Sequence, residues 1–139
     1  MDKTQSQTKP MPISKQMVWA AYQKVKTKGK AYGVDHVSMK DFEMKLSGNL
    51  YKIWNRLASG TYFPPAVREV EIPKKDGKMR KLGIPTIGDR IAQSVVKDYM
   101  ESSIDKLFHE NSYGYRPLKS AYQALTRARL NVKQYDWVI

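Results

Sequence analysis

Residues 67–84 read VREVEIPKKDGKMRKLGI, and this stretch decides the fold class. Its first part mixes β-branched residues with charges, and the proline that follows is incompatible with a helix, so it predicts a strand. The Asp76-Gly77 dipeptide is typical of a tight turn, and Met79 to Ile84 returns as a second strand before the next proline. The sequence therefore predicts an exposed β-hairpin with a basic tip.

Helical patterns flank this hairpin on both sides. Apolar residues recur at steps of three and four, and Ser14, Ser38 and Thr86 each stand where an N-cap is expected. Ser38 and Thr86 are each followed three residues later by Asp, which resembles a capping box. The expected helices cover 14–28, 38–59, 86–107 and 121–132, with a loop at 109–117 and the start of a strand at 135–139. Helices around one hairpin predict an α+β fold.

Composition narrows the protein class. The chain has 139 residues and no cysteine, which allows one domain or a piece of one and excludes a disulfide scaffold, a thiolate metal site and a catalytic thiol. Hydrophobic residues make up 41% of it, with three Trp, nine Tyr and three Phe, so the chain can bury a core. A globular domain is expected.

The two ends of the chain also allow predictions. Residues 1–12 are polar, contain two prolines and show no periodicity, so they predict a disordered lead-in. The sequence has no run of about 18 apolar residues and no signal peptide, so we expect an intracellular protein, or one made without its targeting segment, and no membrane contact. The chain ends on Trp137-Val138-Ile139, which favours a piece cut from a longer protein.

The formal net charge is +12, from 25 Lys and Arg against 13 Asp and Glu. Such a field favours polyanions, so nucleic acid is the expected partner, with a Lys-rich solvated surface as the alternative. Catalytic sets are absent from the sequence: His36 and His109 lack neighbours at metal-ligand spacing, and no phosphate-loop or nucleophile-elbow motif occurs. Glu69 and Glu71 share one face of a strand and are expected to be solvated. Composition alone therefore predicts a binding protein.

The basic residues of the hairpin concentrate around one turn. Their mutual repulsion is unfavourable unless a polyanion binds there, and a triphosphate or a nucleic-acid backbone fits that requirement. The alternative is that lysines protect an exposed strand edge from aggregation. The residues concerned are Lys74, Lys75, Lys78, Arg80 and Lys81.

Several short motifs occur in one recognisable order. They are Gly33-Val34-Asp35, Ile72 to Gly77 with Arg80, Leu82 to Thr86, Asp89-Arg90, and Ser112 to Pro117. In order and spacing the chain resembles bacterial group II intron-encoded reverse transcriptases over about residues 33–139. After the tail expected at 1–12, the resemblance implies a helical extension at 13–60 and, at 61–139, the mostly helical fingers subdomain of a right-hand polymerase. Residues 135–139 are similar to the segment that leads into the first palm strand, so the catalytic Asp is expected beyond this chain.

The resemblance also implies residue roles. Lys74 and Arg80 match fingers residues that hold the triphosphate of the incoming nucleotide, and fixed cations suit that task. Arg116, placed in the same nucleotide-binding set, matches a position near the template and the nascent base pair; a buried structural cation is the alternative.

A second set is expected to contact the template or other RNA. Leu82 to Pro85 match the stretch along which the template runs, where Gly83 allows close approach or forms a β-bulge. Residues 31–37 match a loop that lies against template and primer, although the family commonly has Gly at the position of His36. The whole set is Asp35, His36, Lys75, Lys78, Lys81, Leu82, Gly83, Ile84, Pro85, Arg90 and Tyr115.

The function implied by the resemblance is that of a fingers fragment of an RNA-directed DNA polymerase that is also a maturase, active in RNA splicing and in intron mobility as a retroelement. Its partners would be an RNA template, a DNA primer and group II intron RNA, in a cytoplasmic bacterial ribonucleoprotein. Mg²⁺ and a dNTP would serve the longer enzyme, with metal ligands outside this chain, so the chain itself is not expected to polymerise. Exposed apolar helices suggest self-association, for example as a homodimer. The alternatives are a stand-alone RNA-binding module in intron folding and splicing, and a reverse transcriptase of a retron or diversity-generating element.

Overall fold

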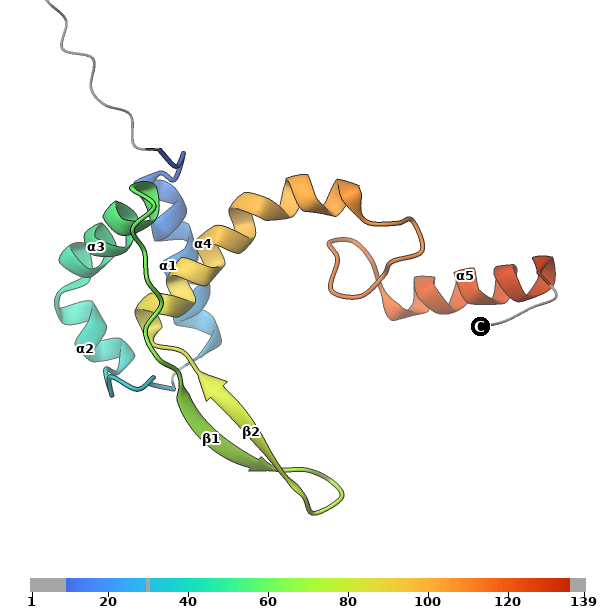
Figure 1. The fold of residues 1–139 in the computed structure, drawn as a ribbon, viewed down its shortest axis with the longest axis horizontal. Coiled ribbons are helices and arrows are strands. Elements are labelled where there is room, and N and C mark those ends of the chain that lie inside the picture. Colours follow the sequence, from blue (N-terminus) through green and yellow to red (C-terminus); the bar gives the residue numbers. More distant parts are fainter. Residues whose placement is uncertain (1–9, 30, 136–139) are drawn as a thin grey trace, which may run out of the picture. The chain divides into compact units, whose positions relative to one another are not determined.

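The computed structural model describes residues 10–29 and 31–135 (Figure 1). The chain divides into two compact units, residues up to Tyr99 and residues from Met100 onward. In chain order the elements are α1 (Lys15–Lys28), α2 (Met39–Met44), α3 (Leu46–Ala58), β1 (Arg68–Pro73), β2 (Met79–Ile84), α4 (Ile87–Ile104), a 3₁₀ turn (Asp105–Leu107) and α5 (Ala121–Gln134). Helices with one two-stranded antiparallel sheet in the described residues confirm the α+β prediction.

Local capping explains where the first helices begin. The Ser14 hydroxyl accepts a hydrogen bond from the Met17 amide at 3.2 Å. Ser38 and Asp41 form a complete capping box, in which the Ser38 hydroxyl accepts from the Asp41 amide at 3.2 Å and the Asp41 carboxylate accepts from the Ser38 amide at 3.1 Å. Each cap satisfies backbone donors that a helix leaves unpaired, so both predicted starts are confirmed.

The helix expected over 38–59 is two helices, and the prediction of one continuous element is wrong. Lys45 leaves the helical region with φ −122° and ψ 37°, and so separates α2 from α3. The Asn49 side chain donates to the Phe42 carbonyl at 2.9 Å and satisfies an acceptor near the break. The apolar spacing survives this break, because Phe42, Ile53 and Leu57 are all buried.

The hydrophobic core lies within the first unit and collects one face from each of its helices. α1, α2, α3 and α4 all contribute, and Ile91 and Val95 of α4 are completely buried. Leu46, Leu50 and Trp54 pack against the core as partly buried residues. Burial of this apolar surface is the main stabilising contribution available to the unit.

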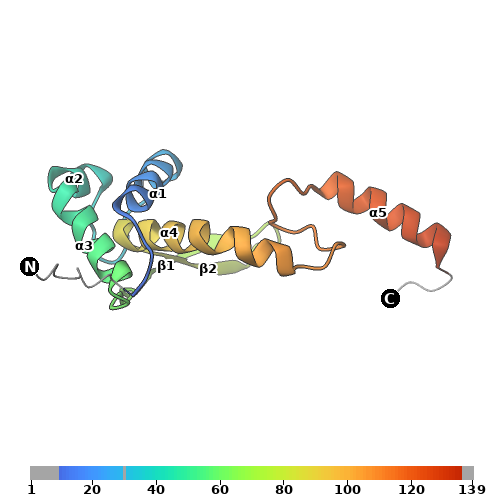
Figure 2. The ribbon, with the colours of Figure 1, turned by 90° about the horizontal axis from the view of Figure 1, so that it is seen from above.

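The hairpin extends away from α1, α2 and α3 (Figures 1 and 2). β1 and β2 pair in an unbroken antiparallel register, from Arg68 opposite Ile84 to Pro73 opposite Met79. Gly77 turns the chain with φ 80°, a conformation that favours glycine, so the predicted turn is confirmed. β2 then leads through Pro85 and Thr86 directly into α4, which ties the base of the hairpin to the core helices.

The second unit is built differently. The helix predicted to reach residue 107 ends at Ile104, and Leu107 lies in the 3₁₀ turn with 83% of its surface exposed. α5 forms as predicted over Ala121–Gln134 but has no buried residue; Leu125 and Val132 are 61% and 60% exposed. Of the predicted strand at 135–139, residues 136–139 lie outside the described residues, as do residues 1–9 of the expected lead-in.

Candidate nucleic-acid interface

The register gives the hairpin two chemically different faces. Side chains alternate along a strand, and residues directly opposite each other share a face. The face that we call the cationic face carries Arg68, Val70, Ile72, Lys74, Lys78, Arg80, Leu82 and Ile84. The opposite face, the acidic face, carries Glu69, Glu71, Pro73, Met79, Lys81 and Gly83.

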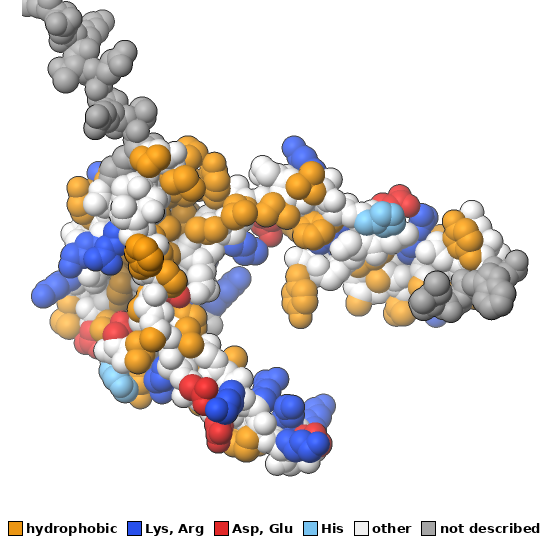
Figure 3. Space-filling model, viewed as in Figure 1, with side chains coloured by type: hydrophobic (Ala, Val, Ile, Leu, Met, Phe, Trp, Pro, Cys, Tyr) orange, Lys and Arg blue, Asp and Glu red, His pale blue; other side chains and the backbone are white. Residues whose placement is uncertain are grey.

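The tip of the cationic face brings three cations together. The Lys74 amide donates to the Lys78 carbonyl at 2.7 Å, which continues the register and sets these residues opposite each other. Arg80 stands opposite Ile72, one same-face position from this pair. Figure 3 shows Lys and Arg side chains gathered at this end of the hairpin. Lys78, expected among the template contacts, therefore shares a face with the two predicted triphosphate ligands.

Lys81 lies on the acidic face. Its ammonium is 2.9 Å from the Glu69 carboxylate, and Glu71 stands directly opposite it. Both partners of the ion pair are largely exposed, so the pair contributes little to stability. The structure thus separates Lys81 from the cations with which it was grouped by sequence.

The base of the cationic face is joined to the loop at residues 31–37. The Arg68 guanidinium lies 4.3 Å from the centroid of the Tyr32 ring, and its Nε donates to the Tyr32 carbonyl at 3.1 Å. The His36 ring stacks at a tilt beside Tyr32, with 5.1 Å between centroids. Sequence reasoning missed Arg68 and Tyr32, although Arg68 has the same strand parity as Lys74 and Arg80.

Gly33 fixes this loop against the entry to α4. A Cβ atom at Gly33 would lie 2.6 Å from both the Cα and the N of Thr86 and 2.9 Å from the carbonyl carbon of Pro85. Backbone packs on backbone here, and only glycine fits without a shift. Arg90 holds the start of the loop from α4, donating to the Gly29 carbonyl at 3.4 Å and to the Ala31 carbonyl.

The turn inside the loop places His36 in a backbone conformation that glycine favours. His36 has φ 54°, in the left-handed region that glycine favours, and its amide donates to the Gly33 carbonyl at 3.3 Å. The Asp35 carboxylate accepts from the Val37 amide at 3.3 Å, as in an Asx turn. The loop keeps a glycine-like turn with histidine in place, and Asp35 shapes this turn.

The stretch expected beneath the template is divided between the faces. Leu82 and Ile84 lie on the cationic face, and Leu82 is 45% exposed. Gly83 pairs with Glu69 in the regular register, so the β-bulge alternative is not observed, and a Cβ there would come 3.0 Å from the Val67 side chain. Pro85 is half-buried beneath Gly33.

A buried polar network supports the start of α4. Asp89 is 3% exposed, and its carboxylate accepts from the Tyr62 hydroxyl at 3.1 Å and from the Gln93 amide group at 2.8 Å. The Asp89 amide donates to the Thr86 hydroxyl at 3.2 Å, as the capping pattern predicts. Burial, followed by the charge of Asp89 and its hydrogen bond, raises the pKa of Tyr62 above its usual value.

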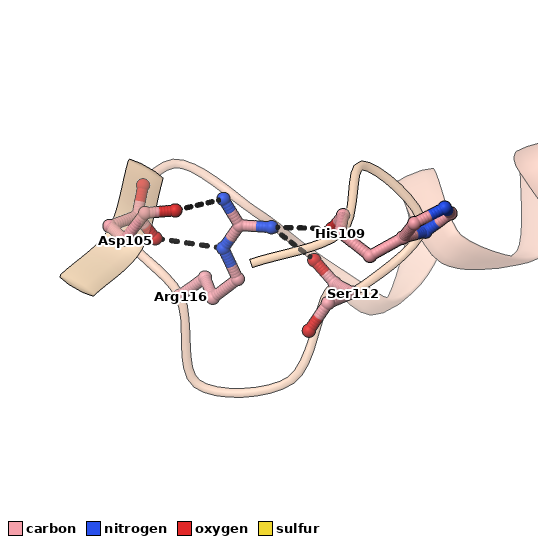
Figure 4. A network of polar contacts seen from close by, with 4 residues as sticks. All are labelled: Asp105, His109, Ser112 and Arg116. Carbon is pink, nitrogen blue, oxygen red and sulfur yellow. Dashed lines mark hydrogen bonds and ion pairs between the residues drawn. The ribbon is translucent and has the colours of Figure 1, made fainter. Parts of the chain in front are cut away.

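Arg116 organises the loop of the second unit (Figure 4). Its Nε donates to the Asp105 carboxylate at 2.7 Å, and its terminal nitrogens donate to the carbonyls of His109 at 3.0 Å, Ser112 at 2.9 Å and Asp105 at 2.9 Å. Hydrogen bonding to Arg116 holds the pKa of Asp105 below its ordinary value. These contacts favour the structural-cation alternative; contact with a nucleotide stays a prediction.

The same loop displays Tyr115 to solvent. Tyr115 is fully exposed with φ 56°, and Leu118 is 98% exposed with φ 58°. Left-handed backbone at non-glycine residues is unfavourable and persists where the surroundings enforce it. An exposed ring of this kind suits base stacking, and the RNA role of Tyr115 stays a prediction.

Two further properties concern the described residues as a whole. They hold no group of three or more His, Cys, Asp or Glu side chains that could bind a metal ion. Within the same described part of the chain, every helix is too short or too polar to cross a bilayer.

Comparisons with known proteins give several relatives. The chain is 39% identical over 100 residues to protein YkfC of Escherichia coli, covering 72% of this chain and 26% of that protein. It is 38% identical over 89 residues to the group II intron-encoded protein LtrA of Lactococcus lactis, covering 63% of this chain and 15% of LtrA. A putative COX1/OXI3 intron 1 protein of Saccharomyces cerevisiae matches at 31% over 90 residues, 65% of this chain and 11% of that protein.

The chain therefore spans only about a quarter, or less, of the length of each of these relatives. A search against protein-family profiles found no match. Two of the relatives carry an intron origin in their names, and both matches extend over more than half of this chain. By homology, this chain is a relative of the group II intron-encoded proteins that its motifs resemble.

Proposed function

We propose that this chain is a nucleic-acid-binding fingers region of a group II intron-encoded reverse transcriptase and maturase. The observation that carries the proposal is the close packing of Gly33 against the backbone of Pro85 and Thr86. Two motifs far apart in sequence meet at this point, directly at the base of the cationic hairpin. The relatives named as intron-encoded support the same reading.

The cationic face offers a graded surface for a nucleic-acid strand. At its tip, Lys74, Lys78 and Arg80 supply positive charge for phosphates. Its middle is apolar and suits sugars and base edges, while the Arg68–Tyr32 stack at its base suits an aromatic base. Charge at one end and stacking at the other would fix the register of a bound template–primer.

The same tip suits a triphosphate. Fixed cations beside a nucleotide's phosphates bind it and orient it, and they stabilise charge that develops during transfer. Lys74 and Arg80 were predicted for this role, and the register adds Lys78 to them. Mg²⁺ and a dNTP would serve the longer enzyme, and we assign no catalytic step through the metal to this chain.

In the whole protein we expect intron RNA, an RNA template and a DNA primer as partners, within a ribonucleoprotein that acts in splicing and intron mobility. Arg116 would contribute by presenting Tyr115 on a fixed loop, since its donors are engaged with that loop. The homodimer stays a prediction.

The test uses an RNA template annealed to a shorter DNA primer and compares two double variants of equal charge. Binding by the unmodified chain should fall by roughly a thousandfold between about 50 and 200 mM salt if six or more phosphates are contacted. Lys74→Gln with Lys78→Gln should lower affinity and flatten the salt dependence, because both residues lie on the cationic face. Equal losses from Lys75→Gln with Lys81→Gln would contradict the assignment of the face.

A further inference from the structure

A second cationic site lies between α1 and α4, away from the hairpin tip. It is a pocket of about 610 Å³ within the first unit. Its lining residues are Lys24, Val25, Lys28, Gly29, Arg90, Gln93, Ser94, Lys97 and Asp98. Four of these side chains are basic and one is acidic, so the pocket concentrates positive charge at the carboxyl end of α1.

Arg90 is one of the residues that line this pocket. Its guanidinium donates to the Gly29 carbonyl at 3.4 Å and to the Ala31 carbonyl, and so ties the pocket to the loop of the candidate interface. Its Nε is buried and has no hydrogen-bond partner among the residues that the structure describes. A buried unsatisfied donor is unfavourable, and an acceptor oxygen that reaches Nε itself would remove that cost.

We propose that this pocket binds a backbone phosphate of the same RNA that the cationic face contacts. The inference rests on the proposed function and extends it to a second contact on α1 and α4. A phosphate oxygen is the acceptor that a guanidinium and neighbouring ammonium groups bind best, with Gln93 and Ser94 available as further polar groups.

The lining also determines which part of the RNA binds. Val25 is the one apolar side chain among the residues that line the pocket, and none of them is aromatic, so a base has no surface on which to stack. A phosphodiester is therefore preferred over a free nucleotide. Arg90 contacts both the pocket and the loop that carries Tyr32, so a strand could pass from one contact to the other.

Asp98 reduces the positive charge of the pocket. Its carboxylate lies 2.6 Å from the Lys24 ammonium and is partly exposed. It therefore pairs with Lys24 and would repel a bound phosphate. Removing this carboxylate should strengthen RNA binding, whereas a merely structural ion pair would predict no gain.

The experiment measures binding of the RNA template–DNA primer to the 139-residue chain at several salt concentrations. Lys28→Gln with Lys97→Gln should reduce the slope of log affinity against log salt by roughly 1 to 2, as expected for two lost phosphate contacts. The matched control, Lys106→Gln with Lys133→Gln, removes the same charge from the second unit and should change the slope little. Asp98→Asn should tighten binding severalfold.

The results distinguish the pocket proposal from the proposed function and from binding of free phosphate. If the pocket variant behaves as the control does, or if Asp98→Asn weakens binding, the pocket proposal is wrong while the hairpin test above still decides the proposed function. If millimolar inorganic phosphate raises the melting temperature and the pocket variant abolishes that rise but leaves the RNA salt slope unchanged, the ligand is free phosphate and the RNA assignment is wrong. Urea unfolding midpoints near that of the unmodified chain confirm that each variant is folded.

Discussion

The two units of this chain are stabilised by different physical means. The first unit buries apolar side chains from four helices, and its functional loop is seated by backbone contact at Gly33. The described part of the second unit, residues 100–135, has no fully buried residue and is organised by polar contacts, among them those of the Arg116 and Arg127 guanidinium groups. We infer that the first unit resists local change through its core, while order in the second depends on polar contacts.

The second unit also exposes large apolar side chains. They include Ile104, Leu107, Phe108, Tyr122, Leu125, Leu130 and Val132. Soluble monomers rarely expose extended apolar patches, so such side chains commonly mark a surface that another chain or domain covers. The contrast with the first unit can be tested by substitutions of the same kind in each.

The largest effect is expected from Ile91→Ala in the first unit. Ile91 is completely buried, so losing its methyl groups leaves a cavity in the core and should lower the free energy of unfolding by about 2–5 kcal/mol. Leu125→Ala in α5 is the matched control, because Leu125 is 61% exposed and its loss should cost less than about 0.5 kcal/mol. Urea unfolding measures both, and equal losses would contradict the division into a core-based and a polar-centred unit.

A smaller loss of stability, joined to a loss of binding, is expected from Gly33→Ala. The new Cβ would lie 2.6 Å from the Thr86 backbone, so the loop must shift, at a cost of about 1–3 kcal/mol. RNA affinity should fall with it, because the loop and the hairpin base would separate. Gly48→Ala in α3 meets nothing within 4 Å and should instead stabilise the helix by up to about 1 kcal/mol, with binding unchanged. Unchanged binding by Gly33→Ala would show that the loop is no part of the interface.

Much of the fold could be predicted because its signals are local. The capping residues Ser14 and Ser38 act on amides three positions away, and the Asp76-Gly77 turn acts within the hairpin. The break at Lys45 could not be predicted, since the apolar spacing on both sides continues as if the helix were unbroken. The exposure of α5 could not be predicted either. Apolar periodicity identifies the apolar face of a helix but does not show whether another part of the protein covers that face.

The sequence names candidate site residues, which stay a prediction, but it could not show how these residues are arranged on a surface. Motif order selected the hairpin cations and the loop, yet only the register shows that Lys78 joins Lys74 and that Lys81 turns toward Glu69. Contacts between distant segments, such as Arg68 with Tyr32, leave no local signal in one sequence. Strand parity would have been the one usable clue to Arg68.

The smallest effect on overall stability, confined to the second unit, is expected from Arg116→Lys. Lysine keeps the charge but cannot make the forked set of bonds to Asp105, His109 and Ser112, so the loop should open while the first unit stays folded. Hydrogen exchange should show lost protection at the Ser112 amide, which donates to the His109 carbonyl at 3.0 Å. Arg129→Lys on the exposed surface of α5 is the control and should leave this protection intact.

Acid should have the same local effect as Arg116→Lys, through the other partner of the pair. The pKa of Asp105 is lowered in the folded loop by its hydrogen bond with Arg116, so the ionised carboxylate stabilises the loop above the ordinary Asp pKa near 4. That contribution is lost as pH falls through the lowered pKa, so protection at Ser112, corrected for intrinsic exchange, should be constant from about pH 7 to 5 and decline below about pH 4. Asp105→Asn keeps an oxygen acceptor but cannot titrate, and its protection should be lower at pH 7 and independent of pH in this range. If Asp105→Asn still showed the acid transition, while the amides of α3 stayed protected, another group would control the loop and the central role of the Arg116–Asp105 pair would be refuted.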